Sequence, residues 1–482
     1  MGDIEDLDSS VPVGSKSDIG IRVRLRKKQL KEDREETIPS PIHDSDLPWK
    51  HTVYVKTWGC SHNSSDSEYM AGLLANSGYK ITQNTDDADL WLLNSCTVKT
   101  PSENQFENMI RQGKERGKHV VVAGCVSQAA PNEPWLKDIS IIGVKQIDQV
   151  VNVVDECFKG NVVRLLSRNR TMPALNIPKI RRNEFVEILA INTGCLNQCT
   201  YCKTKQSRGN LQSYPLEQLV EQARTAFERD GCKELWLTSE DLGAWGRDIG
   251  LVLPDLLKEL VKVIPDGCYM RLGMTNPPYI LDHLEEIAEI LNHPRVYSFL
   301  HIPVQAGSDS VLLDMKREYT INHFCQIVDY LKQKVPNIYI CTDFICAFPT
   351  ETVEDFQESL ELVKKYEFPS LFINQFYPRN GTPAARLKKH TTIEARRRTS
   401  EMTKLFHSYR RYKPDYIGRE FDVLICEKAT DGLHFVGHNK SYEHILVPSS
   451  ENLMGKRVRV RITEVSKFYM KSIVVSKNEC YE

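Results

Sequence analysis

Short runs of apolar and β-branched residues alternate with longer segments of helical periodicity along most of this chain. Between residues 51 and 160, three such runs are typical of buried strands and end at Cys60, Cys96 and Cys125. Alternating β and α elements predict a doubly wound parallel sheet, whose ligands bind beyond the carboxyl ends of the strands. All three cysteines are therefore expected at one edge of this N-terminal sheet.

The same alternation continues from residue 185 to about residue 378 and indicates six β/α units. The expected strands are 185–193, 233–238, 268–274, 297–304, 338–346 and 370–377. Six units predict an open, partial (β/α)6 barrel, with its chemistry at the carboxyl ends of the strands. Cys195 directly follows the first of these strands.

The pattern changes after residue 413 to short strands with alternating polarity, clearest at 421–426, 444–448 and 456–462. This C-terminal region is predicted to be a small all-β barrel. In its last clear strand, arginines alternate with Val and Ile, so one face is apolar and the other basic. Such a face suits contacts to RNA, although a solvated surface of an ordinary barrel remains the alternative. The basic residues concerned are Lys440, Arg457, Arg459, Arg461 and Lys471.

These patterns divide the chain of 482 residues into five parts. A charged arm at 1–48 is predicted to be disordered, and domains at 51–160, 185–413 and 414–477 follow, with a linker at 161–184. The formal net charge of −1 is too small for the protein as a whole to attract nucleic acid electrostatically. Any RNA binding therefore depends on local basic patches. Neither a secretory signal nor an apolar run of membrane-spanning length is visible, which predicts a cytoplasmic protein. The 14 cysteines then indicate metal-bound or free thiols.

The most specific motif is the CxxxCxxC spacing of Cys195, Cys199 and Cys202. Three thiolates on a four-iron cube leave one iron open to a small chelating molecule. A structural zinc site is the alternative, but it usually needs a fourth ligand, and no second pair or histidine lies nearby. Three buried core thiols are the other alternative. The spacing favours an iron–sulfur cluster that takes part in chemistry.

Cys60, Cys96 and Cys125 form a second set of three thiols whose support is positional, because the spacings between them are long. Free cysteines are also among the most buried residues, so core thiols near strand ends explain the pattern equally well. On the residues alone, cluster binding and simple burial stay open here.

With the aromatic Tyr201 before Cys202, the motif matches the CxxxCxΦC signature of the radical S-adenosylmethionine superfamily. All three domains together resemble the methylthiotransferase family, including its C-terminal TRAM domain. The similarity rests on the segments 57–68, 93–98, 123–126, 195–209, 301–308 and 376–383. The Trp-Gly-Cys-Ser-His-Asn form and the segment 271–278 are most similar to the eukaryotic branch, which acts on threonylcarbamoyladenosine in tRNA.

The resemblance implies two [4Fe–4S] clusters and S-adenosyl-L-methionine. Cys195, Cys199 and Cys202 would hold the cluster that cleaves S-adenosylmethionine to a 5′-deoxyadenosyl radical. Cys60, Cys96 and Cys125 would hold an auxiliary cluster that delivers sulfur. The product would be 2-methylthio-N6-threonylcarbamoyladenosine beside the anticodon. The implied partners are tRNA and an electron donor resembling flavodoxin or a ferredoxin reductase, and the protein is expected to be a monomer.

Further contacts to S-adenosylmethionine or substrate are expected from polar residues at the barrel strand ends and from Tyr201. A structural role for polar side chains at strand ends is the alternative. The residues concerned are Ser239, Glu240, Gln305 and Arg317.

Other functions remain open at this point. Related enzymes act on isopentenyladenosine in tRNA or on an aspartate of a ribosomal protein; a noncatalytic RNA-binding scaffold and an electron carrier are further alternatives.

The family's Gly-Phe-Pro-Gly-Glu-Thr segment is replaced here at 347–352 by Ala-Phe-Pro-Thr-Glu-Thr. Eukaryotic relatives usually continue into a membrane anchor at the endoplasmic reticulum, and no such apolar segment is expected in this chain.

Overall fold

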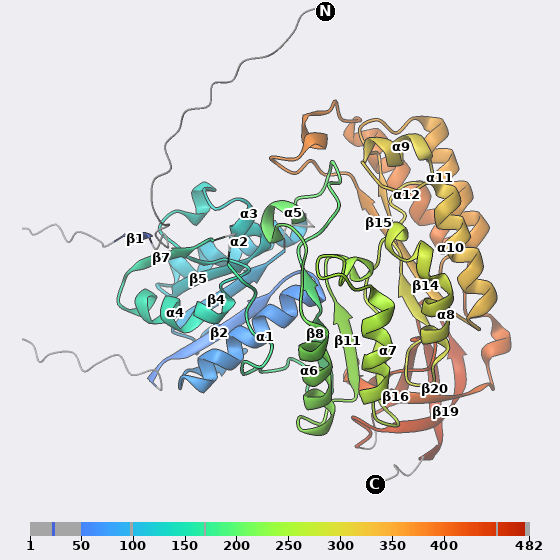
Figure 1. Cartoon of the computed structure of the whole chain (residues 1–482), viewed down its shortest axis with the longest axis horizontal. Helices are drawn as coiled ribbons and strands as arrows, with labels where there is room; N and C mark the ends of the chain where they lie inside the picture. Colours follow the sequence, from blue (N-terminus) through green and yellow to red (C-terminus); the bar gives the residue numbers. More distant parts are fainter. Residues whose placement is uncertain (1–21, 25–49, 97–99, 168–169, 450–451, 478–482) are drawn as a thin grey trace, which may run out of the picture.

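The computed structural model describes residues 22–24, 50–96, 100–167, 170–449 and 452–477. Figure 1 shows an N-terminal sheet with its helices beside a central set of strands and helices, with a C-terminal all-β barrel beneath the latter. This arrangement confirms the mixed α/β fold predicted from the sequence, with each of its three regions in the expected order.

The N-terminal sheet has seven strands in the order β1-β7-β6-β5-β4-β2-β3, and all neighbours are parallel except β1 and β7. Separate hydrophobic clusters cover its faces, one including α1 and α4 and the other α2, so the sheet is doubly wound. The elements are β1 Arg22–Arg24, β2 Thr52–Thr57, α1 Ser61–Asn76, β3 Lys80–Thr82, β4 Leu90–Ser95, α2 Thr100–Glu115, β5 His119–Gly124, α3 Cys125–Ala129, β6 Ser140–Ile142, α4 Val150–Phe158 and β7 Val162–Leu165.

Strand β1 corrects part of the prediction for the charged arm. Arg22–Arg24 pairs with β7 at the edge of the sheet, because the alternation of arginine and valine suits an edge strand. The remainder of the arm, and the predicted domain boundary near residue 48, lie outside the described residues.

The central region is the predicted partial barrel. It consists of two three-stranded parallel sheets, β12-β11-β8 and β13-β14-β15, linked by bridges from Met270 to Val296 and from Met274 to His301. Its elements are β8 Val186–Ala190, β9 Asn192–Thr193, α5 Thr204–Arg208, β10 Gln212–Ser213, α6 Leu216–Glu228, β11 Glu234–Thr238, α7 Leu253–Val263, β12 Tyr269–Arg271, α8 Leu284–Asn292, β13 Phe299–His301, α9 Asp309–Asp314, α10 Ile321–Lys334, β14 Tyr339–Cys346, α11 Val353–Tyr366, β15 Ser370–Gln375 and α12 Thr392–Ser408.

The C-terminal region closes into a five-stranded barrel in the order β16-β17-β18-β20-β19. Alternate residues of β16 and β19, among them Val423, Ile425, Val458 and Val460, fill its interior. The strands are β16 Glu420–Lys428, β17 His434–His438, β18 His444–Pro448, β19 Arg457–Val465 and β20 Met470–Lys477.

Candidate metal centres at two strand-end edges

Cys60, Cys96 and Cys125 lie at one edge of the N-terminal sheet. Cys60 caps α1 after β2, Cys96 follows β4, and Cys125 begins α3 after β5, and these three strands are neighbours. Gly59 has a φ of +119°, and a Cβ atom there would lie 2.2 Å from Cβ of Cys96. Only glycine fits this close approach, which brings the thiols of Cys60 and Cys96 within hydrogen-bonding contact.

The thiols of this site differ in acidity. The hydrogen bond with Cys96, together with the nearby charges of Arg208 and His62, lowers the pKa of Cys60 to about 6. Burial raises the pKa of Cys125 to about 11, although Arg208 opposes this shift. One member of the set is therefore a thiolate at neutral pH, the form in which sulfur binds metals.

This difference predicts selective alkylation of the metal-free protein. Iodoacetamide should modify Cys60 at a rate that rises as the pH passes about 6, because the thiolate is the nucleophile. Cys125 should stay largely unmodified at neutral pH. Peptide mass spectrometry over a pH series measures both rates in one sample, and equal rates at neutral pH would contradict the assignment.

Cys195, Cys199 and Cys202 lie on the loop that leads from β9 into α5. The amide of Cys195 donates to the Gly209 carbonyl at 3.2 Å, and the amide of Cys202 donates to the Cys199 carbonyl at 3.1 Å. The amide of Thr204 also donates to Sγ of Cys202, at 3.4 Å. Backbone hydrogen bonds thus hold the three thiols on one short loop.

Arg317, one of the predicted cofactor-binding residues, lies against this loop. Its Nη1 is 3.2 Å from Sγ of Cys199, its Nε is 3.2 Å from the Tyr319 hydroxyl, and its Nη2 donates to Oδ1 of Asn276. Asn276 in turn donates to the buried Asp241 carboxylate at 2.7 Å. Burial raises the pKa of Asp241 to about 6. Neither Asn276 nor Asp241 was predicted as a site residue, although Asn276 lies in the segment 271–278 and Asp241 directly follows Glu240.

The other predicted cofactor-binding residues have different surroundings. Tyr201 packs edge-to-face on Phe348, and Oγ of Ser239 accepts from the amide of Asp241 at 3.0 Å. Gln305 has a φ of 71° between β13 and α9, with its amide donating to the Asp343 carbonyl. Contact of Tyr201, Ser239 and Gln305 with S-adenosylmethionine or substrate therefore stays a prediction.

Glu240, another predicted cofactor-binding residue, lies between two regions of the protein. Its Oε1 is 2.8 Å from Nδ1 of His62 and 3.2 Å from Nε of Arg208, so its carboxylate joins the N-terminal and central regions. A contact of Glu240 with S-adenosylmethionine or substrate stays a prediction. His62 and Arg208 were not predicted, since their partners are far away in the sequence.

A short helix connects the two cysteine sites. Helix α5 begins with Thr204 at Cys202 and ends with Arg208, whose guanidinium donates to Oδ1 of Asn63, the atom that also accepts from Sγ of Cys125. Five helical residues span about 7.5 Å, so the two sites are close neighbours. Arg379, whose Nη1 is 3.5 Å from Oε2 of Glu103, also lies near thiols of both sites.

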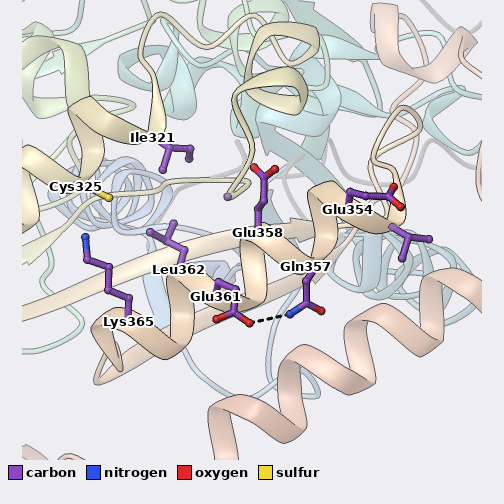
Figure 2. A pocket seen from close by; sticks show the side chains of 10 residues that line it. Ile321, Cys325, Glu354, Gln357, Glu358, Glu361, Leu362 and Lys365 are labelled. Carbon is purple, nitrogen blue, oxygen red and sulfur yellow. Dashed lines mark hydrogen bonds between the residues drawn. The ribbon is translucent and has the colours of Figure 1, made fainter.

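A surface hollow lies away from the two cysteine sites. It has a volume of about 850 Å³ and lies between the start of α10 and the exposed face of α11, where Figure 2 shows the acidic side chains Glu354, Glu358 and Glu361. None of the six candidate cysteines lines it. Its size alone does not make it the functional site.

The chemistry of the cysteine sites fits clusters better than single ions. Within the described part of the chain, no three Cys, His, Asp or Glu side chains converge closely enough to hold one metal ion. Three sulfur donors at each site are compatible with the clusters that the sequence predicts, and the cluster at the N-terminal set stays a prediction.

Comparisons with known proteins agree with this geometry. The chain matches the uncharacterized protein family UPF0004 over residues 52–141, the Radical SAM superfamily over 189–363 and the TRAM domain over 414–475. It is 55% identical over 98% of its length to the threonylcarbamoyladenosine tRNA methylthiotransferase of Drosophila pseudoobscura pseudoobscura, covering 87% of that protein. The corresponding human protein is 54% identical, with coverage of 100% of this chain and 84% of the relative.

The chain belongs to the threonylcarbamoyladenosine tRNA methylthiotransferase family. The predicted family is therefore confirmed. Among solved structures, the radical S-adenosylmethionine methyltransferase TsrM from Kitasatospora setae has a TM-score of 0.51 at 13% identity, covering 70% of this chain and 77% of TsrM. That likeness shows a shared fold alone.

Membership of the radical S-adenosylmethionine superfamily implies S-adenosylmethionine and a [4Fe–4S] cluster. The loop of this methylthiotransferase that carries Cys195, Cys199 and Cys202 lies within the matched range, and its three thiols fit that cluster. Among the described helices, none combines the length and apolar character needed to cross a lipid bilayer.

In the TRAM region of this methylthiotransferase, the basic face of β19 is present but partly neutralised. Arg457 and Arg459 lie 3.2 and 3.3 Å from Asp422, and Arg459 and Arg461 lie 3.4 and 2.8 Å from Glu420. Three guanidinium groups against two carboxylates leave one net positive charge. Lys471 pairs with Glu464 at 2.8 Å.

Lys440 was predicted to bind RNA, and that role stays a prediction. Its Nζ donates to the Leu291 carbonyl at 2.8 Å and also to the Val296 carbonyl, so the side chain joins the barrel to the central region. Burial lowers the pKa of Lys440 to about 8. Sequence proximity to other basic residues suggested a surface role, but the loop faces the domain interface.

Proposed function

We propose that this protein adds a methylthio group to carbon 2 of N6-threonylcarbamoyladenosine beside the anticodon of tRNA. The observation that carries the proposal is the adjacency of two three-thiol sites through α5. Relatives that are 54 to 55% identical over almost the whole chain are named for this substrate and this group transfer.

Two clusters would be held by the two cysteine sets. Cys195, Cys199 and Cys202 would bind the reducing cluster with S-adenosylmethionine, and Cys60, Cys96 and Cys125 would bind the auxiliary one. When bound, these groups supply the radical that removes hydrogen from an unactivated ring carbon and the sulfur that replaces it. The second cluster is part of this proposal, and it is supported by the convergence of three neighbouring strand ends.

The chain's own residues orient these groups. Arg317 hydrogen-bonds Cys199, and the Thr204 amide hydrogen-bonds Cys202, so both stabilise thiolate charge on the reducing side. On the auxiliary side, Arg208 and His62 place positive charge beside Cys60.

The nucleoside composition of tRNA tests the substrate. In a strain that lacks its own enzyme, this chain should restore 2-methylthio-N6-threonylcarbamoyladenosine, and the Cys199→Ala variant should not. Mass spectrometry of digested tRNA measures this nucleoside together with methylthio isopentenyladenosine. Restoration of only the latter nucleoside, or of neither, would reject the substrate assignment.

The basic face of β19 is the proposed RNA contact. Replacing Arg457, Arg459 and Arg461 with alanine should weaken tRNA binding, and the slope of log affinity against log salt should fall by about 1 per arginine that contacts phosphate. Filter binding at several salt concentrations measures both quantities. Arg224→Ala, which removes an exposed arginine of α6, is the matched control. An unchanged salt slope in the triple variant would exclude this face.

The same proposal includes an electron donor resembling flavodoxin or a ferredoxin reductase, because cleavage of S-adenosylmethionine consumes one electron. It also includes a monomeric protein in the cytoplasm. The near-neutral net charge and the local basic strand are consistent with one chain engaging one tRNA.

A further inference from the structure

Helix α5 is tied to both cysteine sites by its two ends. Its first amide, that of Thr204, donates to Sγ of Cys202 at 3.4 Å. Four residues later, the guanidinium of Arg208 reaches the opposite site, where it donates to Oδ1 of Asn63, which also accepts from Sγ of Cys125 at 3.7 Å, and lies close to Cys60. A single turn of helix therefore separates a contact to the reducing site from a contact to the auxiliary site.

The guanidinium of Arg208 is fully anchored by groups of this chain. Its Nη2 donates to Oδ1 of Asn63 and Oδ2 of Asp66, both at 2.7 Å, and its Nε lies 3.2 Å from Oε1 of Glu240. An arginine has five N–H donors in a rigid fork, and these three contacts use that fork in several directions. Arg208 thus acts by its charge and position, since it has little freedom to follow a substrate.

The surroundings make that charge effective. The Arg208 side chain is 2% exposed. A cavity of about 20 Å³ beside it, lined in part by His62, Asp66 and Tyr214, has room for about one water molecule. Because so little solvent screens Arg208, its charge and the opposing charges of its partners Asp66 and Glu240 each act on a thiolate-bound group nearby.

We propose that Arg208 is the positioning residue that couples the two cysteine sites. It fixes the auxiliary thiols relative to the loop of Cys202, and its charge raises the reduction potential of the group that the auxiliary thiols bind. The inference rests on the proposed function, because it assumes an auxiliary cluster. Net charge and hydrogen bonds to sulfur are general determinants of cluster potentials.

The test isolates the auxiliary site within the full chain. Replacing Cys195, Cys199 and Cys202 with alanine removes the reducing site, and the midpoint potential of the remaining cluster is then measured by titration. Arg208→Gln in this background should shift the midpoint to a more negative value. Arg208→Lys, which keeps the charge but not the fork, should restore most of the wild-type value.

Asp66→Asn provides a control of opposite sign. It removes a negative charge from the same buried network, so its midpoint should shift to a more positive value. Loss of packing alone would shift both variants in the same direction. If Arg208→Gln fails to retain iron, Asp66→Asn still tests the sign of the charge effect, and a midpoint that does not become more positive in it would overturn the proposal. An unchanged midpoint in Arg208→Gln, or equal shifts in the glutamine and lysine variants, would overturn the proposal.

Positional coupling is measured with both sites loaded. Pulsed electron paramagnetic resonance of the wild-type chain should give a narrow distribution of distances between the reduced clusters, and Arg208→Gln should broaden it. A wild-type chain that holds only one cluster would reject the proposed function itself. Two clusters with an unchanged distribution would reject only the coupling role of Arg208.

Discussion

Replacing a cysteine of either set with alanine should abolish methylthiolation. Only a replacement in the reducing set should also abolish cleavage of S-adenosylmethionine. Cys199→Ala should reduce both 5′-deoxyadenosine and methylthio product to background, because it removes a thiolate from the reducing site. Cys60→Ala should keep 5′-deoxyadenosine formation while the methylthio product disappears. Mass spectrometry of one reaction with tRNA, S-adenosylmethionine and dithionite measures both products.

Cys157→Ala is the matched control for this experiment. Cys157 is a buried thiol of α4 in the same N-terminal region, and it packs in the hydrophobic core. Its replacement should cost about 1 kcal/mol of stability and leave both products. Retention of the methylthio product by Cys60→Ala would mean that the N-terminal thiols do not deliver sulfur.

Glu234→Ala should cause the largest loss of stability that we expect from a single residue outside the cysteine sites. Its buried carboxylate accepts from Trp236 Nε1 at 2.7 Å and from the Tyr297 hydroxyl at 2.5 Å. It also lies 3.4 Å from His438 Nδ1 of the C-terminal barrel. Removing it leaves buried partners unpaired at the domain interface, which costs about 3–5 kcal/mol. Urea unfolding measures the loss.

Exposed Glu259, which pairs with Lys262 at 2.6 Å on α7, is the control, and Glu259→Ala should change stability by less than about 0.5 kcal/mol. A similarly small effect of Glu234→Ala would show that the barrel is held by other contacts.

The same carboxylate has a defined pH dependence. Burial opposes its charge, but the nearby His438 ring and hydrogen bonds from Tyr297 and Trp236 hold the pKa of Glu234 below its ordinary value of 4.5. A group whose pKa is lowered by folding adds stability above its unfolded pKa, and that stability is lost as the pH falls through the folded pKa. The stability advantage over Glu234→Gln should therefore be complete above pH 4.5 and decline below it.

Local spacing and sheet topology explain why the cysteine sites could be predicted. Cys195, Cys199 and Cys202 lie within eight residues, so their common loop is a local property. Cys60 and Cys96 are far apart in sequence, but parallel neighbours in a doubly wound sheet end at the same edge. The strand periodicity was therefore sufficient to predict that these cysteines lie at the same edge of the sheet.

The network around Arg208 could not be predicted in this way. Its partners Asn63 and Asp66 lie 145 and 142 residues away, on a helix whose polar face carries no recognisable spacing relative to α5. Only the packing of the N-terminal region on the central region makes these side chains neighbours, with α3 lying against α5.

Strand alternation predicted the face of Arg457, Arg459 and Arg461 but not its charge. The period of two places these side chains on one side of β19. Their neutralisation by Glu420 and Asp422 depends on the antiparallel register with β16, which pairs Glu420 with Arg461 and Asp422 with Arg459. Register between distant strands is not visible in the alternation itself.

The number of clusters in the purified protein tests the central claim most directly. Iron and acid-labile sulfide should each amount to about eight atoms per anaerobically reconstituted chain, since two four-iron cubes are expected. Replacing Cys60, Cys96 and Cys125 with alanine should lower each value to about four. Replacing the other three cysteines should also leave about four. A wild-type chain with only about four iron atoms, unchanged when Cys60, Cys96 and Cys125 are replaced, would contradict the two-site account.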